Sequence, residues 1–229
     1  MYELRGPCMK KFLGKSFDRG LQFLQPKRME LAGTYSKIFA GASGSLIDIG
    51  SGVGGHLRDV EFNRDLLRVG IDSHQAPLDV ALQNGVYTSV INADAKLFLA
   101  SCEDNSYDFV LASCVIEHLE KEEGLAFLIE IERVAARRVI LFTPNGFVPQ
   151  PPDIDNPANE HKSGWKVEEF RSRGYQVNYG LYGLRFLRTS FGLPTIRPTM
   201  LGDLLLKATS RAVFRLPKLA YQIVAVREV

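Results

Sequence analysis

Three aspartates recur at similar intervals in the first half of the sequence: Asp48, Asp72 and Asp94 are separated by 24 and 22 residues. Each lies at or just after a short apolar run, and Asp48 comes directly before a glycine-rich turn. Carboxylates accept hydrogen bonds from amines and hydroxyls. Asp48 therefore suits a cationic amino-acid group, Asp72 the two hydroxyls of a ribose, and Asp94 the amino group of an adenine.

The glycines at Gly50, Gly52 and Gly55 also satisfy G-x-G-x-x-G, and together with Asp72 they fit the fingerprint of a nicotinamide dinucleotide site. Reading Gly54 in place of Gly55 gives acid-x-G-x-G-x-G, headed by Asp48. An acid in this place suits a pyrophosphate poorly. Two plainer alternatives are an ordinary strand–helix turn for the glycines and, for each acid by itself, a loop carboxylate or helix cap.

Alternating apolar and helical patterns must position these residues. The sequence predicts strands over 46–49, 66–71, 86–91, 109–113 and 139–142, with helices over 56–62, 77–84 and 117–136. Strands that alternate with helices indicate an α/β fold with a parallel sheet and right-handed crossovers. The polar residues then meet at the carboxyl edge of the sheet, where such folds bind ligands.

The segments before and after this core do not follow the same regular alternation of strands and helices. A basic arm, residues 1–44, contains a predicted helix over 29–40 and is expected either to pack on the sheet edge or to cover the ligand. Residues 144–164 hold five prolines and form a long loop. We expect Ser163 to cap a helix over 166–173, and His161 and Trp165 to face either substrate or core. A strand over 175–179, a helix over 200–214 and a last strand over 222–226 follow.

Composition excludes several classes of protein. The 229 residues are 45% apolar, without a run approaching the ~18 residues of a membrane span. Cys8, Cys102 and Cys114 have no C-x-x-C spacing, so neither disulfides nor a metal site are expected, and no secretory signal is evident. These features predict a cytoplasmic protein. Residues 171–218 hold nine cations against one acid, but no nucleic-acid-binding signature. Peripheral membrane contact is a weaker alternative for that region.

The segments LIDIGSGVGG, VGIDS, INAD and YDFVLASCVIEHL together resemble the class I S-adenosylmethionine-dependent methyltransferases, within them the small-molecule group typified by quinone-biosynthesis enzymes. The resemblance covers residues 45–145, and 161–180 more weakly. It implies S-adenosyl-L-methionine as cofactor and Cys114 as a neighbour of the cofactor. The implied cofactor-binding residues are Asp48, Gly50, Ser51, Gly52, Gly54, Asp72, Ser73, Asp94, Ala95 and Ser113.

The resemblance also predicts a Rossmann-like doubly wound sheet with an antiparallel last strand between the fifth and sixth. We expect one domain over 1–229, with a cofactor-binding core over 45–146 and a substrate side over 147–229. The family's Lys-Pro-Gly-Gly turn is replaced by residues 135–138, which leaves the start of the fifth strand open.

The implied reaction moves a methyl group from sulfonium to an O, N or C nucleophile of a small-molecule or amphiphilic acceptor. His118 is the candidate catalytic base, because imidazole titrates near neutrality; a structural role or stacking on the cofactor are its alternatives. An NAD(P)-binding oxidoreductase and a cofactor-binding protein without turnover remain alternative functions. Neither the acceptor nor the oligomeric state follows from the sequence.

Overall fold

The computed structural model of the chain describes residues 30–152, 157–187 and 199–229. Most of the basic arm, together with Arg188 and Arg197 of the basic C-terminal region, lies outside these residues.

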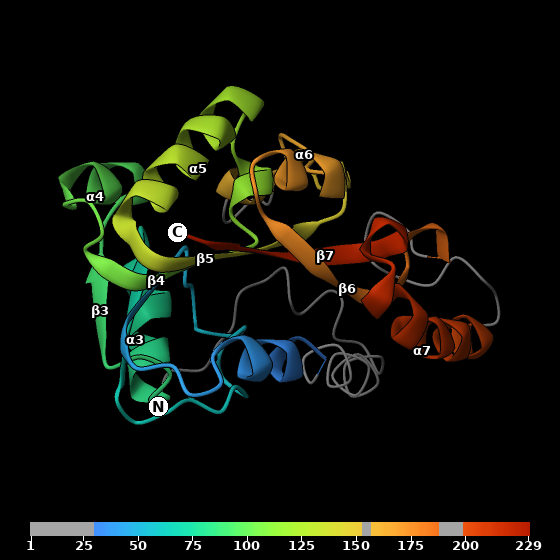
Figure 1. Cartoon of the computed structure of the whole chain (residues 1–229), viewed down its shortest axis with the longest axis horizontal. Helices are drawn as coiled ribbons and strands as arrows, with labels where there is room; N and C mark the ends of the chain where they lie inside the picture. Colours follow the sequence, from blue (N-terminus) through green and yellow to red (C-terminus); the bar gives the residue numbers. More distant parts are fainter. Residues whose placement is uncertain (1–29, 153–156, 188–198) are drawn as a thin grey trace.

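A seven-stranded sheet forms the centre of the molecule (Figure 1). Its strands are β1 (Gly44–Ile49), β2 (Leu66–Asp72), β3 (Ser89–Asn92), β4 (Tyr107–Ser113), β5 (Ala135–Pro144), β6 (Gln176–Leu184) and β7 (Ala220–Glu228). They lie in the order β3-β2-β1-β4-β5-β7-β6. The first five strands are parallel, and β7 pairs antiparallel with β5 and β6. The predicted sheet and the place of its last strand are confirmed.

Helices cover both faces of the sheet. They are α3 (Gln75–Gln83), α4 (Ala95–Ser101), α5 (Lys121–Val134), α6 (Val167–Ser172) and α7 (Thr199–Arg215), with 3-10 turns η1 (Ile116–His118), η2 (Pro157–Asn159), η3 (Arg185–Leu187) and η4 (Pro217–Leu219). In Figure 1, α5 and α6 lie on one side of the sheet, and α3, α7 and the helical segment 30–38 lie on the other. Strands covered on both faces must be apolar almost throughout, which explains the continuous apolar runs in β1, β4 and β5.

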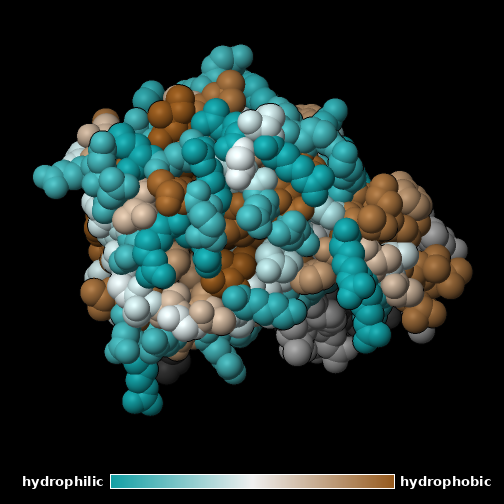
Figure 2. Space-filling view, viewed as in Figure 1, coloured by the Kyte–Doolittle hydropathy of each residue, from teal (hydrophilic) through white to brown (hydrophobic). Residues whose placement is uncertain are grey.

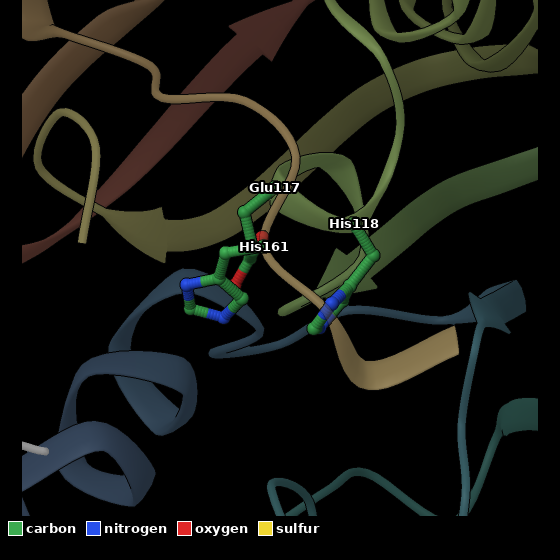
Figure 3. Close-up of side chains that lie close together, drawn as sticks. All are labelled: Glu117, His118 and His161. Atoms are coloured by element: carbon green, nitrogen blue, oxygen red, sulfur yellow. The ribbon is translucent and has the colours of Figure 1, made fainter. Parts of the chain in front are cut away.

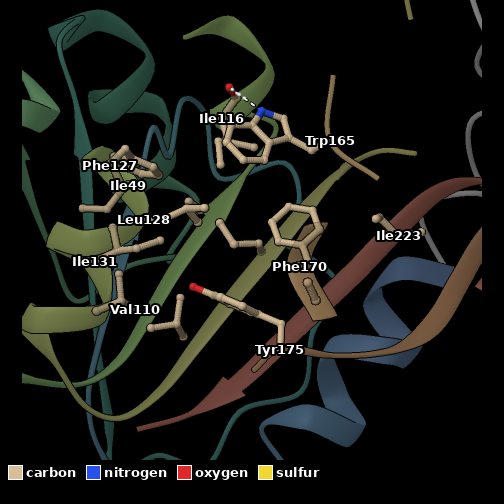
Figure 4. Close-up of a cluster of buried hydrophobic side chains, with 14 of the residues drawn as sticks. Ile49, Val110, Ile116, Phe127, Leu128, Ile131, Trp165, Phe170, Tyr175 and Ile223 are labelled. Carbon is tan, nitrogen blue, oxygen red and sulfur yellow. Dashed lines mark hydrogen bonds between the residues drawn. The ribbon is translucent and has the colours of Figure 1, made fainter. Parts of the chain in front are cut away.

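Each face has its own hydrophobic core. Figure 4 shows the one under α5 and α6, where Leu128 and Ile131 meet Val110 of β4 and the ring of Phe170. On the opposite face, Tyr35 of segment 30–38 and Phe39, the residue that follows this segment, pack among residues of β1, β4 and β5. The described part of the arm therefore packs on a face of the sheet, and not on its edge.

One predicted helix is absent, and the longest predicted helix differs at both ends. Residues 56–59 form turns and no helix, and residues 60–62 have no regular structure. Their backbone N–H groups bond within short turns, as Leu57 N does to Gly54 O and Val60 N to Leu57 O. The predicted helix over 117–136 is divided: η1 ends at His118, Leu119 is extended, and α5 begins only at Lys121. Helix α5 ends at Val134 and β5 starts at the next residue, so no turn separates them. The short α4 was not predicted.

None of the helices among the described residues is long and apolar enough to cross a membrane.

Two neighbours on α5 test the packing. Leu128 is fully buried, whereas Ile129 is 55% exposed. We expect Leu128→Ala to lower the free energy of unfolding by about 2–5 kcal/mol, because it leaves a cavity in the core. Ile129→Ala is the control and should change it by less than about 0.5 kcal/mol. Urea denaturation measures both; equal losses would contradict this packing.

Candidate functional site

Most of the predicted site residues lie along one edge of the sheet. In the parallel register Ile49 of β1 is opposite Ile71 of β2, and Asp72 is opposite Asn92 at the end of β3. Ser113 ends β4. The loops that follow these strands therefore leave the sheet side by side, as the alternation of strands and helices predicted.

The turn after β1 requires glycine at several positions. Gly50, Gly52 and Gly54 have φ angles of 70°, 50° and 71°, a region that residues with a Cβ atom adopt only with strain. A Cβ atom on Gly50 would also lie 2.6 Å from the side chain of Val115. The turn is tied to β2, because Ser51 N donates to Ile71 O at 2.9 Å. Its backbone is thus fixed against β2.

Asp48 is a buried carboxylate with one unused oxygen. Its side chain is in β1, the residue is 2% exposed, and Oδ2 accepts a hydrogen bond from the Tyr87 hydroxyl at 2.6 Å. Oδ1 has no partner. Burial raises the pKa of Asp48 to about 7; the Tyr87 hydrogen bond opposes this shift and the charge of Asp72 adds to it. A buried carboxylate without a full set of partners is costly, so a cationic ligand group would fit beside it.

Asp72 connects the glycine turn to the next loop. Gly52 N donates to Oδ2 and His74 N to Oδ1, both at 2.9 Å. A carboxylate oxygen has a second lone pair, so both oxygens can still accept ligand hydroxyls. Ser73 is exposed beside it, with Oγ 3.1 Å from His74 Nδ1.

The remaining predicted cofactor residues have other partners in the fold. Asp94 is the N-cap of α4, where Oδ1 accepts from Leu97 N at 3.0 Å, and Ala95 is the first helical residue. Asp94 thus has the helix-cap role that the sequence left as an alternative. The cap occupies only Oδ1, so Oδ2 is left for a ligand. The Ser113 hydroxyl is 2.8 Å from the hydroxyl of Tyr35 and therefore points toward segment 30–38.

The turn from β4 into η1 carries a strained residue. Cys114 has φ 56°, and its N donates to Phe142 O at 2.8 Å. Backbone strain of this kind concentrates at functional sites. Burial raises the pKa of the Cys114 thiol well above its usual value, which disfavours a reactive thiolate.

A cluster of Glu117, His118 and His161 lies at the same edge (Figure 3). His118 ends η1 and does not head the long helix as predicted. Its Nδ1 is 2.9 Å from Glu160 O, and Nδ1 of His161 is 2.6 Å from Val148 O. The two imidazole centroids are 4.9 Å apart. Burial lowers the pKa of both rings, which favours their neutral forms.

Glu117, next to His118, was not among the predicted site residues. It is 2% exposed; Oε2 accepts from the Thr143 hydroxyl at 2.9 Å, and Oε1 has no partner. Burial is the main cause that raises the pKa of Glu117 to about 7. The expectation of no metal site rested on cysteine spacing alone, and it did not consider this group.

The loop before α6 is fastened to η1. Lys162 N and Ser163 N donate to Glu117 O, and the Trp165 ring nitrogen donates to Ser163 Oγ at 2.9 Å and to Ile116 O at 3.3 Å (Figure 4). Trp165 is 1% exposed, so it belongs to the core. Ser163 does not cap α6, whose N-cap is Lys166. These bonds hold His161 beside η1.

Comparison with known proteins agrees with this geometry. Residues 47–143 match the sequence model of the family described as "Methyltransferase domain". Among curated proteins, no match to the sequence is found.

Several solved structures have a similar fold. A SAM-dependent methyltransferase from Archaeoglobus fulgidus is 15% identical, with a TM-score of 0.53 over 88% of this chain and 94% of that one. A putative sarcosine dimethylglycine methyltransferase from Galdieria sulphuraria is 17% identical, with a TM-score of 0.53 over 89% and 85%. The plantazolicin methyltransferase BpumL, solved with SAH, is 16% identical, with a TM-score of 0.51 over 97% and 90%.

Asp48 provides a test of the buried charge. Because its pKa is raised from 3.8 to about 7, the folded state holds a proton that the unfolded state has lost between these values. The Asp48 contribution to stability is thus full below about pH 4 and falls by up to ~1.4 kcal/mol per pH unit toward pH 7. We expect Asp48→Asn to gain stability over the wild type as pH rises through this window.

Urea denaturation at several pH values between 4 and 8 measures the difference between the two proteins. Asp65→Asn, in the exposed turn before β2, is the control. A difference between Asp48→Asn and wild type that does not vary with pH would contradict the assignment.

Proposed function

We propose that this chain, an S-adenosyl-L-methionine-dependent methyltransferase by its domain match and its fold, methylates a small acceptor that is amphiphilic or anionic. When bound, S-adenosyl-L-methionine supplies an electrophilic methyl group on a sulfonium. The residues of the chain bind it, orient the acceptor and keep water out of the site.

The edge that follows β1, β2 and β3 suits this cofactor. Asp48 would face the cationic amino-acid end, since its Oδ1 is buried and has no hydrogen-bond partner. Asp72 and Ser73 would bind the ribose, and Asp94 with Ala95 the adenine. The glycine turn, with Ser51, and the backbone of Ser113 would line the path between them. A pyrophosphate beside Asp48 would meet like charge, which argues against a dinucleotide.

His118 is the proposed proton acceptor when the acceptor atom must lose a proton. Because a carbonyl oxygen can only accept, Nδ1 of His118 carries the proton in its contact with Glu160 O. The neutral ring then has its lone pair on Nε2. An imidazole held in one tautomer is suited to general base catalysis.

The nature of the acceptor is inferred from exposed apolar side chains beside a cation, the observation that carries this proposal. Phe186 of η3 and Leu201 and Leu204 of α7 are 71%, 46% and 63% exposed. Arg185 comes directly before Phe186 and donates to Phe147 O at 3.1 Å, just past β5. Figure 2 shows hydrophobic residues gathered at the right-hand end of the molecule, where Figure 1 draws α7.

These side chains lie toward the carboxyl edge. A Cβ atom on Gly183, near the end of β6, would touch Leu206 of α7, while Gly180 lies against Val213. The first turns of α7 therefore extend to the edge at which β6 ends. Farther along α7, Lys207, Arg211 and Arg215 line a separate groove of about 890 Å³ that they share with Lys37.

An acceptor with an apolar body and an anionic group would suit the surface formed by Arg185, Phe186, Leu201 and Leu204. A molecule of the quinone-precursor type or a glycolipid precursor has that character. We also propose a cytoplasmic location, a single domain with the division stated above, and no nucleic-acid partner. Peripheral membrane contact remains the second interpretation of the exposed apolar residues.

The cofactor assignment predicts selective stabilisation. S-adenosylhomocysteine should raise the melting temperature, because it binds only the folded state, whereas NAD and NADP should not. We expect Asp72→Ala to weaken its binding by roughly 1.5–3 kcal/mol, the contribution of hydrogen bonds to a charged acceptor. Asp79→Ala, which removes an exposed charge from α3, is the matched control. Stabilisation by a dinucleotide alone would reverse the assignment.

The acceptor assignment predicts an effect of charge reversal at the edge. Arg185→Glu should lower kcat/KM about 10-fold or more on an anionic acceptor, because a charge-assisted hydrogen bond contributes ~1.5–3 kcal/mol. Arg64→Glu makes the same change in the exposed loop before β2 and should leave kcat/KM unchanged. A panel of acceptors with and without an acidic group measures the effect; equal rates for both variants would exclude this surface.

Flotation with vesicles separates the membrane alternative. Salt-sensitive binding only to anionic vesicles would favour a lipid surface over a pocket. If the protein binds no vesicles, the result favours the interpretation that the exposed apolar side chains contact the acceptor.

A further inference from the structure

Glu117, His118 and His161 bring together one carboxylate and two imidazoles, two kinds of side chain that bind metal ions. One ligand atom from each lies within 4.8 Å of the others, and Figure 3 shows the side chains gathered between η1 and the loop before α6. Glu117 and His118 come from η1, and His161 from a segment more than 40 residues later. Only the tertiary structure brings the three together.

Both imidazoles have their free nitrogen in the form that binds a metal. His118 Nδ1 donates to Glu160 O and His161 Nδ1 donates to Val148 O. Each ring is therefore neutral with a lone pair on Nε2. Histidines that bind metals usually donate the other ring N–H to a carbonyl or carboxylate in this way, which fixes the tautomer and the ring orientation.

Glu117 supplies a second and independent indication. Its Oε1 is fully buried and has no hydrogen-bond partner, although Oε2 is held by the Thr143 hydroxyl. A buried carboxylate oxygen without a partner is rare in folded proteins and calls for an explanation. A cation bound at Oε1 would remove the cost, and no Lys or Arg side chain of the described residues forms an ion pair with Glu117.

The cluster is held in place before any ion binds. Lys162 N and Ser163 N both donate to Glu117 O, and Ser163 Oγ donates to Ile116 O at 3.2 Å. Lys121 Nζ donates to Gly164 O at 2.9 Å and lies over the Trp165 ring. Ligands mounted on elements that are fixed in this way lose little entropy when they bind.

We propose that Glu117, His118 and His161 form a binding site for a divalent transition-metal ion, with Zn²⁺ the first candidate. Two imidazoles and one carboxylate, with at least one coordination position open, are the donor set of catalytic zinc and of non-haem iron sites. Ligand atoms of one tetrahedral zinc lie about 3.4 Å apart, so the three side chains move closer together when the ion binds.

The role of this metal site in catalysis rests on the proposed function, whereas the binding of the ion does not depend on it. An open position facing the acceptor can hold an acceptor oxygen and lower its pKa. His118 Nε2 cannot bind an ion and accept a proton at the same time. Metal binding therefore also decides which of these two roles His118 has.

Binding is tested with the metals alone on the untagged full chain after treatment with a chelator. Calorimetric titration with ZnCl₂, MnCl₂ and MgCl₂ should show one Zn²⁺ per chain, with weaker Mn²⁺ and little Mg²⁺ binding, as imidazole ligands imply. Glu117→Gln and His161→Asn should each weaken Zn²⁺ binding by ~100-fold or more, since even outer-sphere substitutions cost 10–100-fold. His74→Asn, at a mostly exposed histidine outside the cluster, should bind as the wild type does.

Circular dichroism of the metal-free variants checks that they are folded. The Co²⁺ form provides a second readout: absorption from thiolate ligation would assign the ion to one of the three cysteines, Cys8, Cys102 or Cys114, and overturn the proposal. Absence of saturable Zn²⁺ binding to the wild type, or equal binding by all variants, would also overturn it. If no ion binds while His118→Ala lowers turnover and keeps its affinity for S-adenosylhomocysteine, His118 is the base and the methyltransferase assignment stands.

Discussion

The contact between η1 and the loop that ends at Trp165 holds the two sides of the site together. The carbonyls of Ile116 and Glu117 accept hydrogen bonds from Ser163, Lys162 and the Trp165 indole, and the indole itself fills the space above α5. A Cβ atom on Gly124 of α5 would overlap that ring. Because η1 follows β4 after only two residues, this contact ties the loop before α6 to the central strand, while Gly146 N, which donates to Trp165 O at 2.7 Å, ties it to the segment after β5.

The same edge carries two buried carboxylates that are poorly satisfied within the chain. Asp48 and Glu117 each keep one oxygen with a hydroxyl donor, Tyr87 and Thr143, and one without a partner. For both, burial raises the pKa to about 7. A core built for stability alone would replace such groups, so their presence in β1 and in η1, the turn that follows β4, points to ligands that complete them.

The antiparallel β7 makes an acceptor side possible. It enters between β5 and β6, which moves β6 to the border of the sheet and brings η3 and the start of α7 beside the residues that follow β5. Asn145 fixes this junction from inside: its side-chain nitrogen donates to the carbonyls of Pro217, Lys218 and Ala220. Asn145 thereby fixes the segment before β7 against the carboxyl end of β5, at the same edge of the sheet as the loops that follow β1 and β2.

Local patterns in the sequence determined the central sheet and the glycine turn, because buried parallel strands are apolar throughout and a turn with positive φ angles needs glycine. The spacing of Asp48, Asp72 and Asp94 placed all three at one edge for the same reason. Local patterns could not divide the predicted helix over 117–136, since the extended Leu119 carries no periodic signal. Nor could they join His161 to Glu117 and His118, or show that Trp165 is core and that Ser163 binds η1. Those contacts depend on segments distant in the chain, and only their packing in the folded protein decided them.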